Sequence, residues 1–269
     1  MYKKILQAFA LLGICCCCAA FIKRNKPTLY LIGDSTVATG SPTNPIQGWG
    51  GLVDQFFDTT RINIQNRAVS GTSTRTYQTN GVHDKKMLAN GMWDGVLKTL
   101  KKGDYVMMQF GHNDETPVAD TTRHRGSIKG IGDDTLVVFN KFLNRTETVH
   151  TYGWYLTKFI TEIQKRGATA ILCSPVPMNR WKDDKIIRRD NDYAKWAEEI
   201  AAKHGASFIA LNKIAADKYD ELGKAEVTSG YFVADNVHTN AKGAQLHVQI
   251  VINEIKKMKK CDLKKYIKP

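Results

Sequence analysis

Five short apolar segments, separated by helical patterns, are the feature of this sequence that most limits its fold. They lie at residues 28–32, 62–66, 105–110, 168–173 and 206–211. Apolar residues recur with helical spacing over residues 152–163, and Gly167 ends that pattern. The same spacing recurs over residues 193–201, just before Gly205. Strands that alternate with helices favour a parallel sheet covered on both faces, so the sequence predicts an α/β fold.

Other patterns complete the expected order of elements. Helices are expected over residues 49–57 and 87–100. A C-terminal helix is expected from an apolar face made of Leu246, Ile250, Val251 and Ile255. The connection 115–150 is long and has no strong helical period. We expect it to hold a small hairpin, residues 136–139 paired with 148–150, that borders the functional site.

The composition suits one large domain. The chain has 269 residues, of which 42% are hydrophobic and 24% charged, both usual for a soluble globular protein. No internal repeat or low-complexity linker divides the sequence. We therefore predict a single catalytic domain over residues 28–260, preceded by a leader.

Residues 1–20 have the pattern of an export signal. A basic pair near the start is followed by an apolar run, residues 5–14, and by small residues at 18–20. Two alternatives stay open. The apolar stretch continues to Ile22, as in a retained membrane anchor, and one of the cysteines at 15–18 could carry a lipid. We expect the leader to be cleaved and the protein to be exported to the periplasm, the cell surface or the medium.

Cysteine usage predicts neither a disulfide framework nor a metal centre. Four of the six cysteines lie in the leader. Cys173 ends an apolar segment and is expected to be a small buried hydrophobic residue. A disulfide between Cys173 and Cys261 stays open, because the sequence gives no distance between them. No Cys/His spacing is typical of a metal site, so no metal or cofactor is expected.

The chain is strongly basic, with a formal net charge of +13. Cleavage of the leader would lower this charge only by two, since Lys3 and Lys4 are its charged side chains. Such a charge describes either a solvated basic surface or a protein that attracts a polyanion. No nucleic-acid-binding motif is present, so nucleic acid is not an expected partner, and an acidic polysaccharide is the other polyanion to consider.

Four short polar blocks carry the chemistry of the sequence. Ser35 follows the first apolar segment in Gly33-Asp34-Ser35, and Gly71 follows the second. Asn113 follows the third in Gly111-His112-Asn113-Asp114, and Asp235 stands three residues before His238. Functional residues of a parallel sheet gather beyond the carboxyl ends of the strands, so the first three blocks are expected on one rim. A serine there and a late Asp-x-x-His supply a nucleophile, a base and a group that orients the base.

These blocks, in this order, resemble the SGNH (GDSL-like) hydrolases. Further wording is most similar to the rhamnogalacturonan acetylesterases: Gly48-Trp49-Gly50, Thr151-Tyr152-Gly153-Trp154-Tyr155 and the late Asp-x-x-His-x-Asn-x-x-Gly. The resemblance extends from about residue 28 to the C-terminal helix. It implies a flavodoxin-like three-layer sandwich with a central parallel sheet.

The resemblance also implies roles for individual residues. Ser35 would be the nucleophile, His238 the general base, and Asp235 the group that orients His238. The oxyanion would be bound by the backbone N–H groups of Ser35 and Gly71 and by the side-chain amide of Asn113. The order Ser…Asp…His also occurs in α/β-hydrolases, but their serine lies in Gly-x-Ser-x-Gly, which does not surround Ser35.

The activity implied is that of an exported serine esterase that removes acetyl groups from an acidic plant polysaccharide, such as rhamnogalacturonan or another pectin. Arg75, Arg180 and Trp181 are the candidates for holding a sugar ring and a uronate carboxylate. The same triad could instead serve xylan, a short lipid ester or a thioester. A non-catalytic carbohydrate-binding protein on the same scaffold is the alternative from another class. Membrane contact is expected only if the leader is retained or lipidated.

Overall fold

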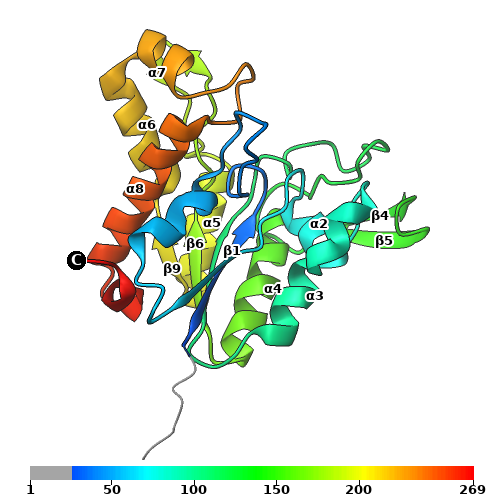
Figure 1. Cartoon of the computed structure of the whole chain (residues 1–269). Coiled ribbons are helices and arrows are strands. Elements are labelled where there is room, and N and C mark those ends of the chain that lie inside the picture. Colours follow the sequence, from blue (N-terminus) through cyan, green and yellow to red (C-terminus); the bar gives the residue numbers. More distant parts are fainter. Residues whose placement is uncertain (1–25) are drawn as a thin grey trace, which may run out of the picture.

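A sheet of five parallel strands forms the centre of the protein, whose computed structural model describes residues 26–269 (Figure 1). Its strands, in spatial order, are β2 (Asn63–Asn66), β1 (Thr28–Gly33), β3 (Tyr105–Gln109), β6 (Thr169–Cys173) and β9 (Ser207–Ile209). All five expected strands are confirmed. The leader, with its three possible fates, lies outside the described residues.

Helices cover both faces of this sheet (Figure 1). One face carries α2 (Thr74–Thr79), α3 (Met92–Thr99), α4 (Tyr152–Lys165) and α5 (Tyr193–His204). The other carries η1 (Trp49–Phe56), α6 (Leu211–Leu222), α8 (Ala241–Lys257) and η3 (Asp262–Tyr266). The predicted three-layer α/β sandwich is therefore confirmed.

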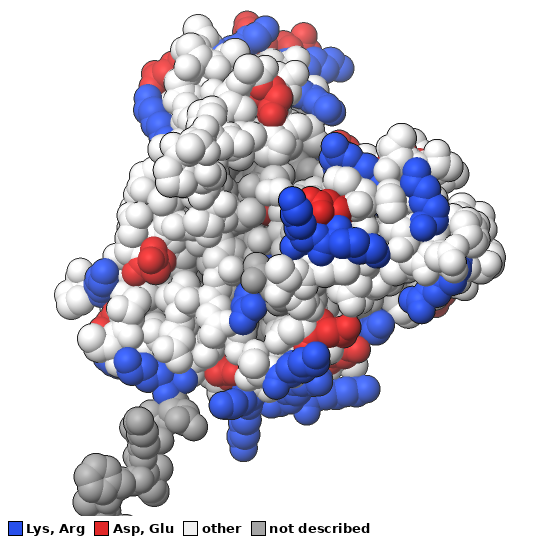
Figure 2. Space-filling model, turned by 45° about the vertical axis from the view of Figure 1, so that its right-hand side comes forward, with Lys and Arg blue, Asp and Glu red and all other residues white. Residues whose placement is uncertain are grey.

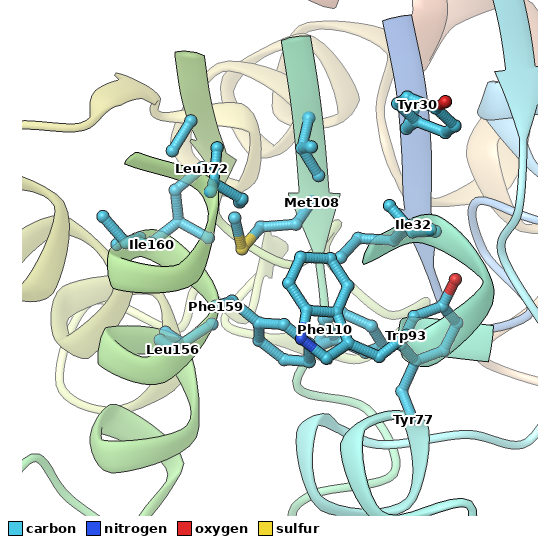
Figure 3. Packing of buried hydrophobic residues seen from close by; sticks show 14 of the residues in the cluster. Tyr30, Ile32, Tyr77, Trp93, Met108, Phe110, Leu156, Phe159, Ile160 and Leu172 are labelled. Carbon is cyan, nitrogen blue, oxygen red and sulfur yellow. The ribbon is translucent and has the colours of Figure 1, made fainter. Parts of the chain in front are cut away.

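Alternation along each strand produces the two apolar cores. Leu29 and Leu31 pack on the face of α8, whereas Tyr30 and Ile32 pack on the face of α4. Successive side chains of a strand point to opposite faces, so a strand buried on both sides is apolar throughout. Figure 3 shows the second core, where aromatic rings such as Trp93 fill the space between sheet and helices.

The strand order places a crevice beside β1. The chain passes from β1 to β2 on one side and then crosses over β1 to β3 on the other side, so the direction in which strands are added reverses at β1. Open α/β sheets bind ligands at such a switch point, beyond the carboxyl ends of the strands. The loops after β1, β2 and β3 meet at this edge, the upper end of β1 in Figure 1.

The expected helix over residues 87–100 is two elements instead of one. A 3-10 helix, η2 (Lys85–Asn90), ends at Gly91, and α3 begins after it. Gly91 has a φ of +69°, and a Cβ there would lie 2.9 Å from the Cα of Gly95. A helix cannot continue through a residue with this backbone conformation. The segment expected as a helix over 49–57 is likewise a 3-10 helix, η1.

The expected hairpin is confirmed in the long connection after β3. Its strands are β4 (Thr135–Asn140) and β5 (Arg145–His150), and the hairpin projects from the domain beside α2 (Figure 1). Two elements that the sequence analysis did not predict lie at the opposite end. They are a short hairpin, β7 (Trp181–Lys182) with β8 (Lys185–Ile186), and the helix α7 (Lys224–Gly230).

The packed domain continues beyond its expected end at residue 260. Leu263 is fully buried, and Ile267 forms a β-bridge with Phe57. Cys173 and Cys261 are both buried free thiols in this core, so the disulfide that the sequence left open is absent. The expected role of Cys173 as a buried small hydrophobic residue is confirmed.

Candidate active site

Ser35 stands on a tight turn directly after β1. The backbone N–H groups of Val37 and Ala38 both donate to the Asp34 carbonyl, at 3.1 and 3.0 Å. The Asp34 carboxylate accepts from the N–H and the hydroxyl of Thr36, at 2.9 and 2.7 Å. The residues on either side of Ser35 are buried, whereas Ser35 is half-buried. The turn therefore presents one side chain, the Ser35 hydroxyl, to the crevice.

The turn is fastened to the neighbouring strand β3. A Cβ at Gly33 would lie 2.5 Å from the carbonyl oxygen of Gln109, so only glycine permits this close approach. The side chain of Gln109 donates to the Thr36 hydroxyl at 2.5 Å and accepts from the Trp49 indole N–H at 2.9 Å. Hydrogen bonds from two elements thus hold the turn that carries Ser35.

A buried histidine ties the same turn to the loop after β3. His112 lies with Nδ1 3.2 Å from the Asp34 carboxylate and Nε2 3.0 Å from the Val176 carbonyl. Burial of Asp34 would raise its pKa, but attraction to His112 and the hydrogen bonds from Thr36 outweigh burial and lower the pKa. His112 therefore acts through structural hydrogen bonds.

Ser35, His238 and Asp235 form one hydrogen-bonded chain. The Ser35 hydroxyl lies 2.7 Å from His238 Nε2, and His238 Nδ1 lies 2.6 Å from the Asp235 carboxylate. The two ends of this chain are 203 residues apart in sequence. The arrangement is that of a nucleophile, a base and a group that orients the base. The structure thus brings together the three residues that the sequence motifs singled out.

Asp235 also holds the turn that carries the histidine. Its Oδ1 accepts from the backbone N–H groups of Val237 and His238, at 2.8 and 2.7 Å. Burial alone would raise the pKa of Asp235. The hydrogen bonds from the two backbone N–H groups and from the imidazole outweigh burial and lower the pKa, so the carboxylate stays ionised. The spacing Asp-x-x-His is what allows one carboxylate to bind both the turn and the ring.

Gly71 and Asn113 complete the pocket around Ser35. Both line the same cavity of about 680 Å³ as Ser35 and His238. Gly71 has a φ of +80°, which residues other than glycine rarely adopt. Asn113 Nδ2 donates to the Thr72 carbonyl at 2.8 Å. An amide nitrogen carries two hydrogens, so Asn113 retains one for a ligand.

Asp114 connects the loops after β2 and β3. Its buried carboxylate accepts from the backbone N–H and hydroxyl of Thr74 and from the hydroxyl of Ser127, the last at 2.9 Å. Burial raises the pKa of Asp114 to about 6, although these hydrogen bonds oppose the rise. Thr74 opens α2 just after Gly71, so Asp114 fixes the spacing between Gly71 and Asn113.

The expectation that Arg75 contacts substrate is wrong. Its side chain is fully buried, and its guanidinium is paired with Glu147 on β5 at 2.8 Å. The remaining donors reach the carbonyl oxygens of Gly126 and Val118, at 2.8 and 3.4 Å. A buried charge requires such partners, and here they come from the hairpin and the loop before it. Arg75 is a structural residue of α2.

Arg180 and Trp181 do not line the pocket either. Arg180 is exposed, and Trp181 begins β7 and packs against the small core around Tyr219 and Phe232. The Trp181 indole N–H donates to the Asn179 side chain at 2.7 Å. Both residues follow β6 in sequence. The backbone N–H of the preceding Asn179 donates to the Asn236 carbonyl at 2.8 Å, so this segment lies beside the loop that carries Asp235 without lining the pocket.

Two arginines that the sequence analysis did not single out line the pocket instead. Arg123 and Arg125 lie on the loop before the β4–β5 hairpin, and His83 and Met87 contribute from the segment around η2. The available signal was Arg123-His124-Arg125, a basic triplet in the connection expected to border the site. Basic residues are common in exposed loops, so this triplet alone does not distinguish arginines that line a pocket from arginines on an ordinary surface loop.

The described part of the chain, residues 26–269, holds neither a metal-binding cluster nor a membrane-spanning helix. No group of three or more His, Cys, Asp or Glu side chains in this part of the chain is arranged to hold a metal ion. No helix within the same residues has the length and apolar character needed to span a membrane.

The geometry of the site agrees with the family that the sequence matches. The GDSL-like Lipase/Acylhydrolase family matches residues 31–246, which include all four polar blocks. The chain belongs to that family. It is therefore a carboxylic ester hydrolase, and its resemblance to the SGNH hydrolases is confirmed.

Two relatives indicate where in the family the chain lies. A rhamnogalacturonan acetylesterase from Emericella nidulans is 30% identical over 220 residues, which cover 81% of this chain and 80% of that protein. A probable rhamnogalacturonan acetylesterase from Bacillus subtilis, YesY, is 24% identical over 234 residues, or 86% of this chain and 93% of that protein.

Solved structures share the fold. The YxiM protein of Bacillus subtilis superposes with a TM-score of 0.66 at 22% identity, covering 87% of this chain and 57% of that chain. Axe2, an acetylxylan esterase from Geobacillus stearothermophilus, gives a TM-score of 0.50 at 16% identity, with 85% and 94% covered. At these identities the likeness concerns the fold alone.

Proposed function

We propose that this protein is a serine acetylesterase that removes acetyl groups from an acidic plant polysaccharide of the rhamnogalacturonan class. The observation that carries the proposal is the hydrogen-bonded chain from Asp235 through His238 to Ser35, at the wall of a pocket that also presents Gly71 and Asn113. The relatives from Emericella nidulans and Bacillus subtilis, both named for rhamnogalacturonan, support the substrate class.

In the first half-reaction Ser35 takes up the acetyl group. Its Oγ attacks the acetyl carbonyl carbon while His238 Nε2 accepts the hydroxyl proton, which 2.7 Å permits without rearrangement. Asp235 stabilises the imidazolium that forms and keeps Nδ1 protonated. The tetrahedral intermediate then expels the sugar oxygen, which takes the proton back from His238. The products are the free sugar hydroxyl and an acetyl-Ser35 ester.

In the second half-reaction water replaces the sugar. His238 accepts a proton from water as the water oxygen attacks the acetyl carbon, and acetic acid leaves when the Ser35 oxygen regains that proton. The released acid then loses its remaining proton to the solvent and becomes acetate. In both halves negative charge develops on the former carbonyl oxygen. The backbone N–H groups of Ser35 and Gly71 and the amide of Asn113 are the donors proposed to bind it.

The pocket suits a polymeric substrate with a small ester. Its volume of about 680 Å³ lies within the range of small-molecule sites, and it is open to solvent along one side, as a chain of sugars requires. Export of the protein, proposed from residues 1–20, would bring it to a plant polymer. Fractionation of producing cells into cytoplasm, periplasm and medium tests this part.

Replacing Ser35 with alanine tests the assignment of the nucleophile. We expect Ser35→Ala to lose hydrolysis of both a small aryl acetate and acetylated rhamnogalacturonan, because neither Asp235 nor His238 can form the acyl-enzyme in its place. Ser41→Ala is the matched control, since Ser41 lies in the same pocket wall and, within residues 26–269, its hydroxyl is hydrogen-bonded to Thr43 alone. Activity of Ser35→Ala comparable to the parent refutes the nucleophile.

The substrate class needs a separate measurement. We expect acetate release from acetylated rhamnogalacturonan to exceed release from acetylated xylan at equal acetyl content. Equal or faster release from xylan contradicts the substrate class while leaving the serine mechanism intact. Binding of both polymers without acetate release from either would instead favour the non-catalytic alternative.

A further inference from the structure

The charge of the pocket is unbalanced. Among the described residues that line it, Glu115 is the one with a carboxylate, and that carboxylate is paired with Arg189 at 2.9 Å. Arg189 also pairs with Asp192 at 2.9 Å, so these three residues form a closed ionic group. Arg123 and Arg125 line the same pocket. The pocket therefore presents two positive charges that no lining carboxylate neutralises.

The two arginines have no direct partner in the described chain, although the more distant carboxylates of Asp120, Asp34 and Asp114 attract Arg125. Within residues 26–269 the guanidinium groups of Arg123 and Arg125 take part in no hydrogen bond or ion pair. The Nε atom of Arg125 is enclosed by protein and still lacks a partner. Burial, followed by repulsion from Arg123, lowers the pKa of Arg125. That atom is too enclosed to reach a ligand itself, but the two terminal guanidinium nitrogens of Arg125 are not enclosed and have no acceptor within residues 26–269, so they are the donors left for a ligand at the pocket wall.

We propose that Arg123 and Arg125 form a carboxylate-binding subsite that holds a uronate of the polymer while Ser35 attacks an acetyl group on the same or a neighbouring sugar ring. This inference rests on the proposed function of the pocket. A guanidinium donates two parallel hydrogen bonds to a carboxylate, which fixes the orientation of the sugar as well as its position. A carboxylate between the two guanidiniums also relieves their mutual repulsion.

The subsite explains how an acidic polymer is distinguished from a neutral one. A uronate carboxylate accepts hydrogen bonds from Arg123 and Arg125 and also neutralises their charge, whereas the hydroxyl groups of a neutral sugar can accept hydrogen bonds but supply no counter-charge. A site built around charged hydrogen bonds discriminates strongly against ligands that cannot make them. The subsite takes the place that the sequence analysis gave to Arg75 and Arg180.

The test compares three substrates across a set of variants. Arg123→Gln, Arg125→Gln and the double variant remove the charge while keeping a polar, though shorter, side chain. Arg125→Lys keeps the charge but loses the fork, and Arg180→Gln is the control for loss of an arginine outside the pocket. The substrates are 4-nitrophenyl acetate, an acetylated galacturonate oligomer and the methyl ester of that oligomer, which has no free carboxylate.

We expect the double variant to lower kcat/KM on the free-acid oligomer by roughly ten- to a hundredfold, as for loss of hydrogen bonds to a charged group. The kcat/KM for 4-nitrophenyl acetate should change by less than about twofold. The preference for the free-acid oligomer over its methyl ester should disappear. Arg125→Lys should fall between the parent and Arg125→Gln. Arg180→Gln should behave as the parent.

Two results overturn the subsite. An equal loss on all three substrates assigns the arginines to the support of the fold or the catalytic groups. An unchanged preference for the free acid in the double variant places the carboxylate elsewhere. Calorimetry of oligogalacturonate binding to Ser35→Ala, with and without the arginine changes, separates the two proposals. A parent that hydrolyses no acetyl ester, with binding that still depends on the arginines, refutes the proposed function and supports the subsite.

Discussion

At the scale of single residues, Asn113 and Asp114 divide two tasks between neighbouring side chains. Asn113 faces the pocket and also donates to the Thr72 carbonyl, whereas Asp114 points away and accepts from Thr74 and Ser127. One side chain is thus available to substrate, and the other holds the loops that position it. Changes at these two adjacent positions should therefore have different effects.

Asn113→Ala is expected to lower kcat by roughly two to three orders of magnitude, with a smaller effect on KM. The amide binds most strongly to the carbonyl oxygen once that oxygen has gained negative charge. Steady-state kinetics on an aryl acetate measure both parameters, and Asn44→Ala, another asparagine of the pocket wall, is the control. A rise in KM with unchanged kcat would identify Asn113 as a substrate contact only.

Asp114 is expected to lower the free energy of unfolding of the protein as the pH rises towards about 6. The folded pKa of about 6 is higher than the value near 4 in an unfolded chain, so the folded state binds the proton more tightly. The contribution of this group is therefore fully present below about pH 4 and is lost as the pH rises to about 6. Its size is on the order of 3 kcal/mol.

Thermal unfolding of the parent and Asp114→Asn between about pH 4 and 7 measures this effect. The useful quantity is the slope of the difference in free energy of unfolding, because an amide nitrogen facing the Thr74 N–H shifts the variant at every pH. We expect the advantage of the parent to shrink as the pH rises. Parallel curves would show that Asp114 has the same pKa in both states.

At the scale of elements, the buried ion pair between Arg75 and Glu147 joins α2 to the β4–β5 hairpin. Glu147 also accepts from the Asn140 side chain at 2.7 Å, so the pair closes a small network under the hairpin. Helix α2 follows directly on the loop that carries Gly71. The pair therefore connects the pocket floor to an element that projects from the domain.

Arg75→Met is expected to destabilise the protein by about 3–5 kcal/mol, because it leaves the Glu147 carboxylate buried without its counter-charge. Adding Glu147→Leu should recover a large part of that loss. Lys218→Met, which breaks an exposed pair with Glu221, is the control and should cost less than about 1 kcal/mol. Urea unfolding measures all four proteins, and a negligible effect of Arg75→Met would exclude the structural role.

At the scale of the whole molecule, basic side chains occur at several places on the surface. Figure 2 shows basic side chains along the lower edge of one face and a separate group near its middle. The formal net charge of +13 therefore acts on an acidic polymer as a general attraction, separate from the two pocket arginines.

Salt should weaken this general attraction. Between about 0.01 and 1 M salt the screening length falls from about 30 to 3 Å, so distant surface charges cease to act on the polymer. We expect KM for acetylated rhamnogalacturonan to rise several-fold over this range, while kcat/KM for a neutral aryl acetate stays constant. Equal salt dependence on both substrates would show that surface charge does not contribute to polymer binding.

The sequence by itself determined the five central strands, the helices α4, α5 and α8, and the position of the catalytic groups. The side-chain periods of strands and helices follow from local backbone geometry, so apolar segments with these periods can be recognised without knowledge of long-range contacts. Ser35, Gly71 and Asn113 each follow a strand, and parallel strands bring their carboxyl ends to one edge. Sheet geometry alone therefore predicted that these residues would meet.

Only the tertiary structure decided which arginines reach the pocket. Arg75 and Arg123 are both charged residues in segments after strands, and nothing local distinguishes them. Arg75 is buried because Glu147, 72 residues later, returns on the hairpin to neutralise it. Arg123 and Arg125 have no such partner among the described residues and remain at the pocket wall. The fate of a charged side chain depends on the partner that folding brings to it, and short sequence patterns do not contain that partner.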